Sequence, residues 1–367
     1  MEINYNFIST IDFLGCLQGL VLGFIVFAAN RKNKKSTFFL ALFVLIYAYC
    51  FIPILVVDLN IVEYYPKLLI LPRPGEWLMT SLFLIYVQKI SIFSDKKNDY
   101  WSLYPGIAIL VLQLLLFFTP VSLKVQVAGT FWYKAIFFLG HVYSAFILYY
   151  TWRFVDRHIT EVENQYSEVE TKRLLWAKRF VLFGFGLFIL HILWFALGNQ
   201  FYFKLIYAIA NVFMLYWASI YGIVQENVHS VIANETLIND LTSTRDDIEI
   251  PNEQLEGIVR QIDHFMKDSE EFTKKNLTIS SVSEKLKIHP RQFSRAINLV
   301  CHENFNAYVN RYRVSKAEQL LTTDSLSNLS IEGIGIEVGF QSKSAFYSAF
   351  KKINGTTPNQ YKAQLFT

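Results

Sequence analysis

Seven apolar stretches within the first 224 residues constrain this chain more than any other feature. Each approaches the ~20 residues that an α-helix needs to cross a bilayer. They lie near residues 11–29, 37–57, 68–90, 101–119, 131–153, 180–198 and 205–224. The third is the weakest, because two prolines, an arginine, a glycine and a glutamate interrupt it, although a helix that starts near Gly75 would still reach Ile92. Only 17% of the chain is charged, whereas a soluble domain has about 25%. The sequence therefore predicts an all-α fold with a seven-helix transmembrane bundle over residues 1–224.

Basic residues in the loops predict how this bundle is oriented, because cytoplasmic loops carry an excess of Lys and Arg. One side holds thirteen of them: Arg31, Lys32, Lys34, Lys35, Lys89, Lys96, Lys97, Arg153, Arg157, Lys172, Arg173, Lys178 and Arg179. The other side holds five: Lys67, Arg73, Lys124, Lys134 and Lys204. We expect a multi-pass protein of the inner (cytoplasmic) membrane, in contact with lipid, with its N-terminus outside and its C-terminus in the cytoplasm. The first span has no basic leader or small-residue cleavage signal, so we interpret it as a retained span.

Polar groups inside the spans are the candidates for sensing a small-molecule or membrane signal. Glu76, His141 and His191 are the main ones, and the two histidines lie near the middle of spans five and six. An ionisable residue within a membrane is by default a functional hypothesis, while the alternative is a hydrogen bond that fixes the bundle. Two histidines without a third ligand do not make a metal site. The three cysteines show no disulfide framework and no metal-ligand spacing.

Residues 225–271 form an acidic linker, with twelve Asp and Glu against three Lys and Arg. Val224, Val231, Ile238 and Leu241 recur at loose heptad positions, which would suit a short parallel coiled coil in a homodimer. The pattern is short, so an ordinary single helix fits equally well. A second amphipathic helix after Pro251 is expected to pack on the segment that follows. Residues 154–179 are the longest cytoplasmic connection and are interpreted as helical extensions that could contact the linker.

Beyond residue 272 the pattern changes to short amphipathic helices separated by turns. Near the C-terminus, Ile331, Ile334 and Val338 recur at helical spacing on one buried face. Gly339 ends that helix, and Ser342 can cap the next one. In that next helix the inner face is Ala345, Phe346, Ala349 and Phe350, and the outer face is Lys343, Ser344, Tyr347, Ser348 and Lys351.

An earlier pair of helices follows the same logic. Val282 and Leu286 form the inner face of its leading helix, and Pro290 suits the first position of the second. That second helix turns Phe293, Ala296, Ile297 and Val300 inward, and Arg291, Gln292, Ser294, Arg295 and Asn298 outward. A longer helix joins the two pairs and spans about 25 Å at ~1.5 Å per residue. Two recognition helices held apart in this way could enter successive major grooves, about 34 Å apart.

Several motifs in this region occur together as a set. They are Phe293, Arg295, Tyr308, Arg311 and the Ala317, Leu320, Leu321 run, then the Gly339-Phe340 corner, Phe346, Phe350-Lys351, Gly355, Thr357-Pro358 and Tyr361. Over roughly the last ninety residues the chain resembles the AraC/XylS family of transcription regulators. Two departures are visible: His302 stands where the family usually has a glycine, and His289 stands where a small hydroxyl cap is usual.

The resemblance implies that the exposed faces of both recognition helices read double-stranded DNA. The readers here would be Arg291, Ser294 and Arg295 from the first helix, and Lys343, Ser344, Tyr347 and Ser348 from the second. Lys351 and Lys352 would contact phosphate. From Phe272 onward thirteen Lys and Arg face six Asp and Glu, and this net charge of +7 favours the phosphate backbone.

These features predict three parts: a membrane sensor domain (1–224), an acidic helical linker (225–271) and an AraC-type DNA-binding domain with two helix-turn-helix units (272–367). Together they indicate a membrane-bound, sequence-specific transcription regulator. One alternative is a seven-span receptor or transporter whose C-terminal tail is an interaction module. Another is a membrane enzyme that uses His141, His191 and Glu76. No phosphate loop, nucleophile motif or full metal set supports catalysis, so we expect a protein that is not an enzyme, with no catalytic residue, metal or cofactor.

Overall fold

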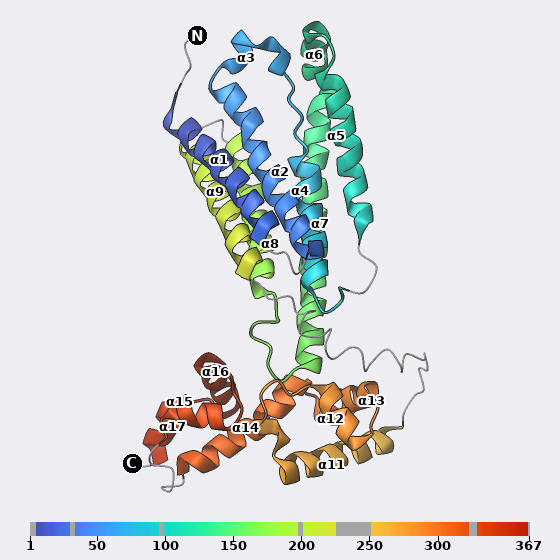
Figure 1. Ribbon diagram of the computed structural model, residues 1–367, viewed down its shortest axis with the longest axis vertical. Helices are drawn as coiled ribbons and strands as arrows, with labels where there is room; N and C mark the ends of the chain where they lie inside the picture. Colours follow the sequence, from blue (N-terminus) through green and yellow to red (C-terminus); the bar gives the residue numbers. More distant parts are fainter. Residues whose placement is uncertain are drawn as a thin grey trace. The chain divides into compact units, whose positions relative to one another are not determined.

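The computed structural model describes residues 5–29, 34–94, 99–196, 201–224, 251–322 and 329–365, and every regular element in these ranges is a helix (Figure 1). This confirms the predicted all-α class. The chain divides into two compact units. Unit 1 comprises Met1–Asp156 and Leu174–Asn234, and unit 2 comprises Arg157–Arg173 and Glu235–Thr367. The segment Arg157–Arg173, which links two apolar helices of unit 1, thus belongs to the C-terminal unit.

Unit 1 contains the apolar helices. Its long helices are α1 (Phe7–Ala29), α2 (Lys34–Asp58), α4 (Gly75–Ile90), α5 (Tyr104–Phe117), α7 (Phe131–Gln165), α8 (Leu175–Ala196) and α9 (Phe201–Val224). The short ones are α3 (Ile61–Tyr64), η1 (Pro66–Leu68), η2 (Tyr100–Leu103) and α6 (Val121–Ala128). Within the described residues, six helices are long and apolar enough to cross a membrane, and α4, with 16 residues, is shorter than the others. The count of seven spans therefore stays a prediction.

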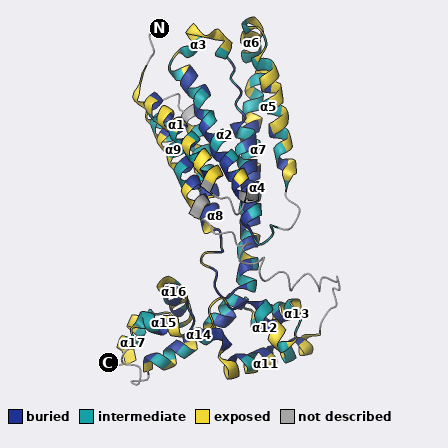
Figure 2. Ribbon diagram, viewed as in Figure 1, coloured by how far each residue is buried: buried dark blue, intermediate teal, exposed yellow. Residues whose placement is uncertain are grey.

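The weakest predicted span, α4, is the most enclosed helix of unit 1. Its residues from Ser81 to Gln88 are all buried, so no face of this stretch is left for lipid. The helix lies against α2 and α5. By contrast, α1 exposes large apolar side chains such as Phe13 and Phe24, and Figure 2 shows exposed residues along the outer faces of α1, α5 and α9. Exposed apolar faces around a buried centre suit a lipid environment.

Close helix packing in unit 1 depends on glycines of α1. A Cβ added at Gly19 would lie 2.8 Å from the Cβ of Ala48 on α2, and one at Gly23 would lie 2.6 Å from Leu45 Cδ2. Both distances are shorter than real Cβ contacts. A side chain at Gly19 would require the helices to separate, whereas at Gly23 the flexible end of Leu45 would have to move aside. Small residues four apart are the usual means by which membrane helices pack closely.

Unit 2 consists of short helices around two cores. They are α11 (Asn252–Ser269), η5 (Glu271–Thr273), α12 (Ile279–Leu286), α13 (Pro290–Ala296), the π-helical turn η6 (Ile297–Cys301), α14 (Phe305–Thr322), α15 (Ile331–Glu337), α16 (Lys343–Asn354) and α17 (Pro358–Leu365). The helix α14 is common to both cores. Phe305 and Tyr308, in its first half, pack with α12 and α13, and Ala317 and Leu321, in its second half, pack with α15 and α16.

The amphipathic helix expected after Pro251 is α11, and its apolar face packs inside unit 2. Leu255, Ile262 and Met266 are each 0% exposed, in clusters that also hold Phe293 and Ala296 of α13. The proposed coiled-coil positions from Val231 to Leu241 lie outside the described residues. The boundary predicted at residue 272 stays a prediction.

Candidate nucleic-acid interface

The first helix pair is fixed by side-chain caps. Thr278 and Ser281 form a capping box at the start of α12, in which the Ser281 amide donates to Thr278 Oγ1 at 3.1 Å. At the start of α13, the Arg291 amide donates to Nδ1 of His289 at 3.2 Å. The imidazole therefore supplies the cap that a hydroxyl usually gives, and this departure from the family pattern is accommodated.

The predicted readers of α13 lie on its solvent side. Arg291 and Arg295 are exposed, and Ser294 is half-buried. Together with Asn298 they line a hollow of about 560 Å³ in unit 2. The inward residue Phe293 is completely buried, as its spacing predicts.

The second helix pair turns at a glycine that no other residue could replace without strain. Gly339 has a φ of 101°, and a Cβ at this position would lie 2.5 Å from Thr273 O. Ser342 then caps α16, because the Ala345 amide donates to its Oγ at 3.1 Å. Phe346 and Phe350 are buried on the inner face. The cap and the inner face predicted for this helix are confirmed.

The predicted readers of α16 differ in their contacts. Lys343 Nζ lies 2.6 Å from Glu332 Oε1, and this ammonium group holds the pKa of the Glu332 carboxyl below its usual range. Tyr347 is half-buried, and its hydroxyl lies 3.4 Å from the same carboxylate. Ser348 and the predicted phosphate-contacting residues Lys351 and Lys352 are exposed. Ser344 is exposed too, and its partner lies on a segment remote in the sequence.

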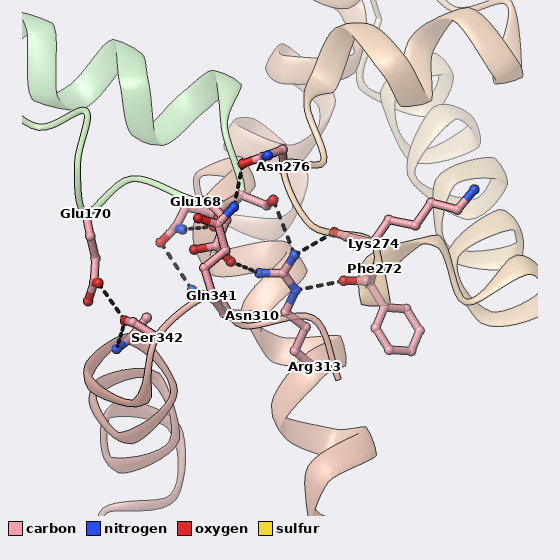
Figure 3. A network of polar contacts seen from close by, with 12 residues as sticks. Glu168, Glu170, Phe272, Lys274, Asn276, Asn310, Arg313, Gln341 and Ser342 are labelled. Carbon is pink, nitrogen blue, oxygen red and sulfur yellow. Dashed lines mark hydrogen bonds and ion pairs between the residues drawn. The ribbon is translucent and has the colours of Figure 1, made fainter. Parts of the chain in front are cut away.

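That remote segment is Arg157–Arg173, here called the α7–α8 segment, and it packs on both helix pairs. Ser342 Oγ donates to Glu170 Oε2 at 2.7 Å (Figure 3). Ser344 Oγ donates to Glu170 Oε1 at 3.1 Å. At the other helix pair, Glu161 and Gln165 line the hollow that contains the α13 readers. The sequence suggested a contact between residues 154–179 and the linker, but gave no sign of this contact with the DNA-reading helices.

Arg313 of α14 anchors the α7–α8 segment from a fully buried position. Its guanidinium donates to Glu168 Oε1 at 2.5 Å, to Phe272 O at 2.7 Å and to Lys274 O at 3.0 Å (Figure 3). Burial lowers the pKa of Arg313, although Glu168 opposes this shift, and burial raises the pKa of Glu168. Each partner of this pair is satisfied by the other. Removing one of them would leave an unpaired buried charge and would strongly destabilise the fold of unit 2.

Main-chain bonds hold the same segment. The Ser167 amide donates to Leu277 O at 3.0 Å, and Asn306 Nδ2 donates to Ser167 O at 2.6 Å. Tyr166 forms an isolated antiparallel bridge with Thr278. The contact is therefore built from backbone and buried groups as well as from surface charges.

In unit 1, the structure brings the three candidate sensing residues together. The rings of His141 and His191 stack with centroids 4.8 Å apart, and both line a cavity of about 310 Å³ with Glu76. Among the described residues, no group of three His, Cys, Asp or Glu side chains could hold a metal ion.

Comparisons with known proteins concern the C-terminal part of the chain. Residues 282–364 match the model of a family described as a helix-turn-helix domain. The HTH-type transcriptional regulator AlkR of Acinetobacter baylyi is 31% identical over 93 residues, which cover 25% of this chain and 29% of that protein. The melibiose operon regulatory protein of Escherichia coli K12 is 31% identical over 86 residues (23% and 28%). The regulatory protein PocR of Salmonella typhimurium is 29% identical over 112 residues (30% and 34%).

The chain thus spans about a third or less of the length of these relatives. No solved structure matches it. The matched residues contain both recognition helices, the joining helix α14, all of α15 and α12 from Val282 onward. Residues 282–364 are therefore a helix-turn-helix domain of the AraC type.

Proposed function

We propose that this protein is a membrane-bound, sequence-specific transcription regulator of the inner membrane, whose membrane unit senses a signal and relays it to the DNA-binding domain. One observation carries the proposal: a single chain joins helices that are long and apolar enough to cross a membrane to an AraC-type domain. Tethering restricts the reader to DNA that comes close to the membrane.

Genome-wide DNA occupancy of the tagged full-length chain, combined with membrane fractionation of the same cells, tests this function. We expect discrete occupied sites and a full-length protein that stays in the membrane fraction. Discrete sites with the tag in the soluble fraction would contradict membrane anchoring. Recovery in the membrane without occupied DNA, together with uptake of a labelled solute, would favour the transporter alternative.

Base reading and phosphate contact are separable in the proposed interface. We expect Arg295→Ala to relax base preference and to cost about 1–3 kcal/mol at the cognate site, because arginine reads guanine edges. Lys352→Ala should weaken binding to all sequences alike and reduce the salt slope by about 1. Competition binding with cognate and scrambled duplexes over a salt series measures both effects. Equal effects of the two substitutions would contradict these roles.

For the signal, we propose the cavity of unit 1. Its volume of about 310 Å³ lies at the small end of the ~300–1,000 Å³ that is typical of ligand pockets. Aromatic side chains such as Phe43 and Phe180 form much of its wall, and buried Glu76 Oε2 accepts no hydrogen bond from the described residues. His141 Nδ1 bonds Phe137 O at 2.8 Å, which leaves Nε2 as an acceptor.

These groups favour a small apolar ligand that carries a hydrogen-bond donor. Such a ligand must bind two states of the protein unequally, or it shifts nothing. We expect Glu76→Gln to abolish the variation of promoter occupancy between growth conditions without changing the sites that are occupied. Unchanged variation in Glu76→Gln and His141→Ala would remove the cavity as the sensing site.

A further inference from the structure

We infer that residues 161–170, here called the acidic segment, occupy the reading surface in place of DNA, so that the domain binds DNA fully only when this segment is released. The inference concerns regulation of the proposed DNA-binding surface and therefore rests on the proposed function. It assigns to the end of α7 and the residues that follow it the role of an internal competitor.

Charge gives the first argument. The acidic segment contains Glu161, Glu163, Glu168 and Glu170 within ten residues, with no Lys or Arg among them. The chain from Phe272 onward carries a net charge of +7, which suits a polyanion. A run of carboxylates presents to such a surface the same sign of charge as a phosphate backbone.

The second argument is the position of the Glu170 carboxylate, which lies at the N-terminus of α16. The two carboxylate oxygens of Glu170 accept hydrogen bonds from Ser342 and Ser344, the cap and the second residue of this helix. The N-terminus of a helix favours anions, because its amides and its dipole point toward them. Since Ser344 is a predicted reader, the carboxylate lies where a DNA group would have to lie.

The other recognition helix gives the third argument. Glu161 and Gln165, at the end of α7, share a hollow with the α13 readers Arg291, Ser294 and Arg295. One short segment thus borders both recognition helices. A duplex that engages these readers would meet the end of α7 in the same space.

The anchoring bonds give the fourth argument. Glu168 pairs with fully buried Arg313, and Ser167 bonds the backbone of Leu277 and the side chain of Asn306. These contacts hold the segment more firmly than surface charges alone, since exposed ion pairs contribute little. The segment continues from α7, the helix that also carries His141 of the cavity. A movement of α7 at the cavity would therefore be transmitted along the same helix to the acidic segment on the reading surface.

The test uses the full chain in detergent micelles, with fluorescein-labelled duplex DNA of random sequence as the probe. Glu170→Ala removes a surface contact and leaves the buried Arg313–Glu168 pair intact. We expect it to bind the probe about tenfold more tightly than the wild type, the effect of losing a charge-assisted contact that competes with DNA. The matched control Glu256→Gln removes an exposed charge on α11 of the same unit and should change affinity less than about twofold.

A cross-link that holds the acidic segment in place tests the same inference. Glu170→Cys and Ser342→Cys, in a background without the three native cysteines, are joined by a short bismaleimide. We expect the joined protein to lose at least about tenfold in affinity relative to the same variant before joining. Unchanged affinity after joining, or an unchanged affinity of Glu170→Ala, would overturn the inference. If the wild type, both Glu variants and the unjoined protein all fail to bind the probe at low salt, the proposed DNA-binding function itself fails.

Discussion

His302 has a φ of 55° directly after the π-helical turn η6, in the left-handed region that favours glycine. The sequence marked this position as a departure from the family, but it could not show how the chain accommodates it. The backbone keeps the conformation that a glycine would adopt, and the histidine bears the strain. His289, the other departure, gains a use as the cap of α13.

Replacing His302 with glycine should stabilise unit 2. Removing the left-handed strain stabilises the folded state by about 1–2 kcal/mol. The greater conformational entropy of glycine in the unfolded chain opposes this by about 0.4–1 kcal/mol. We therefore expect the free energy of unfolding to rise by roughly 0.5–1 kcal/mol. Hydrogen exchange of peptides from α13 and α14 in the full chain measures it. The control Gly339→Ala, at a φ of 101° and against Thr273 O, should shift stability in the opposite direction. Faster exchange in His302→Gly would show that its side chain makes a stabilising contact.

Among the elements, the recognition helices were the most predictable from sequence, because caps, glycine corners and apolar spacing are local signals. Ser342, Phe346 and Gly339 all lie where their pattern places them. The helix α4 shows the opposite case. Its apolar stretch is interrupted, and the described helix starts only at Gly75. Hydropathy therefore makes it the weakest of the predicted spans, although its second half is buried on all sides.

Glu271, in η5, illustrates an element-level contact with a pH signature. Its carboxylate bonds Lys274 Nζ at 2.6 Å and Lys285 Nζ at 2.7 Å, which ties η5 to α12. Burial raises the pKa of Glu271, but the two lysines outweigh burial, so the pKa lies below its usual value of 4.5. A carboxyl whose pKa is depressed by folding contributes stability above the unfolded pKa, and this contribution is lost as the pH falls through the folded pKa.

We therefore expect Glu271→Gln to lower the free energy of local unfolding by about 1–3 kcal/mol at pH 7, the range for hydrogen bonds to charged groups. The difference from the wild type should shrink as the pH falls below 4.5. Hydrogen exchange of peptides from η5 and α12 over a pH series, corrected for intrinsic rates, checks this. Glu303→Gln is the control, since its pair with Arg311 is longer, at 3.4 Å, and more exposed. A pH-independent difference would contradict the ion-pair explanation.

For the whole molecule, the sequence predicts an apolar, membrane part and a DNA-binding part, but it gives no sign that the α7–α8 segment belongs to the second unit. Glu168 and Arg313 are 145 residues apart in the sequence, and no local pattern relates them. Burial of Arg313 could have been suspected, because it lies four residues from Val309 and from Ala317, which are both buried on α14, yet its partner could not. The same holds for the cavity, where His141, His191 and Glu76 come from three helices. Contacts between distant residues arise only from the packed fold.

The predicted topology is a property of the whole chain and can be tested with two cysteines. Thirteen basic residues against five predict that the α7–α8 segment and unit 2 lie in the cytoplasm. In a background in which Cys16, Cys50 and Cys301 are replaced by serine, we expect Ser122→Cys on α6 to react with a membrane-impermeant maleimide in intact cells. Gln292→Cys on α13 should react only after lysis. Both positions are exposed, so a difference reports the side of the membrane and not burial. Labelling of Gln292→Cys in intact cells would place the DNA-binding unit outside and would be incompatible with the function proposed for it.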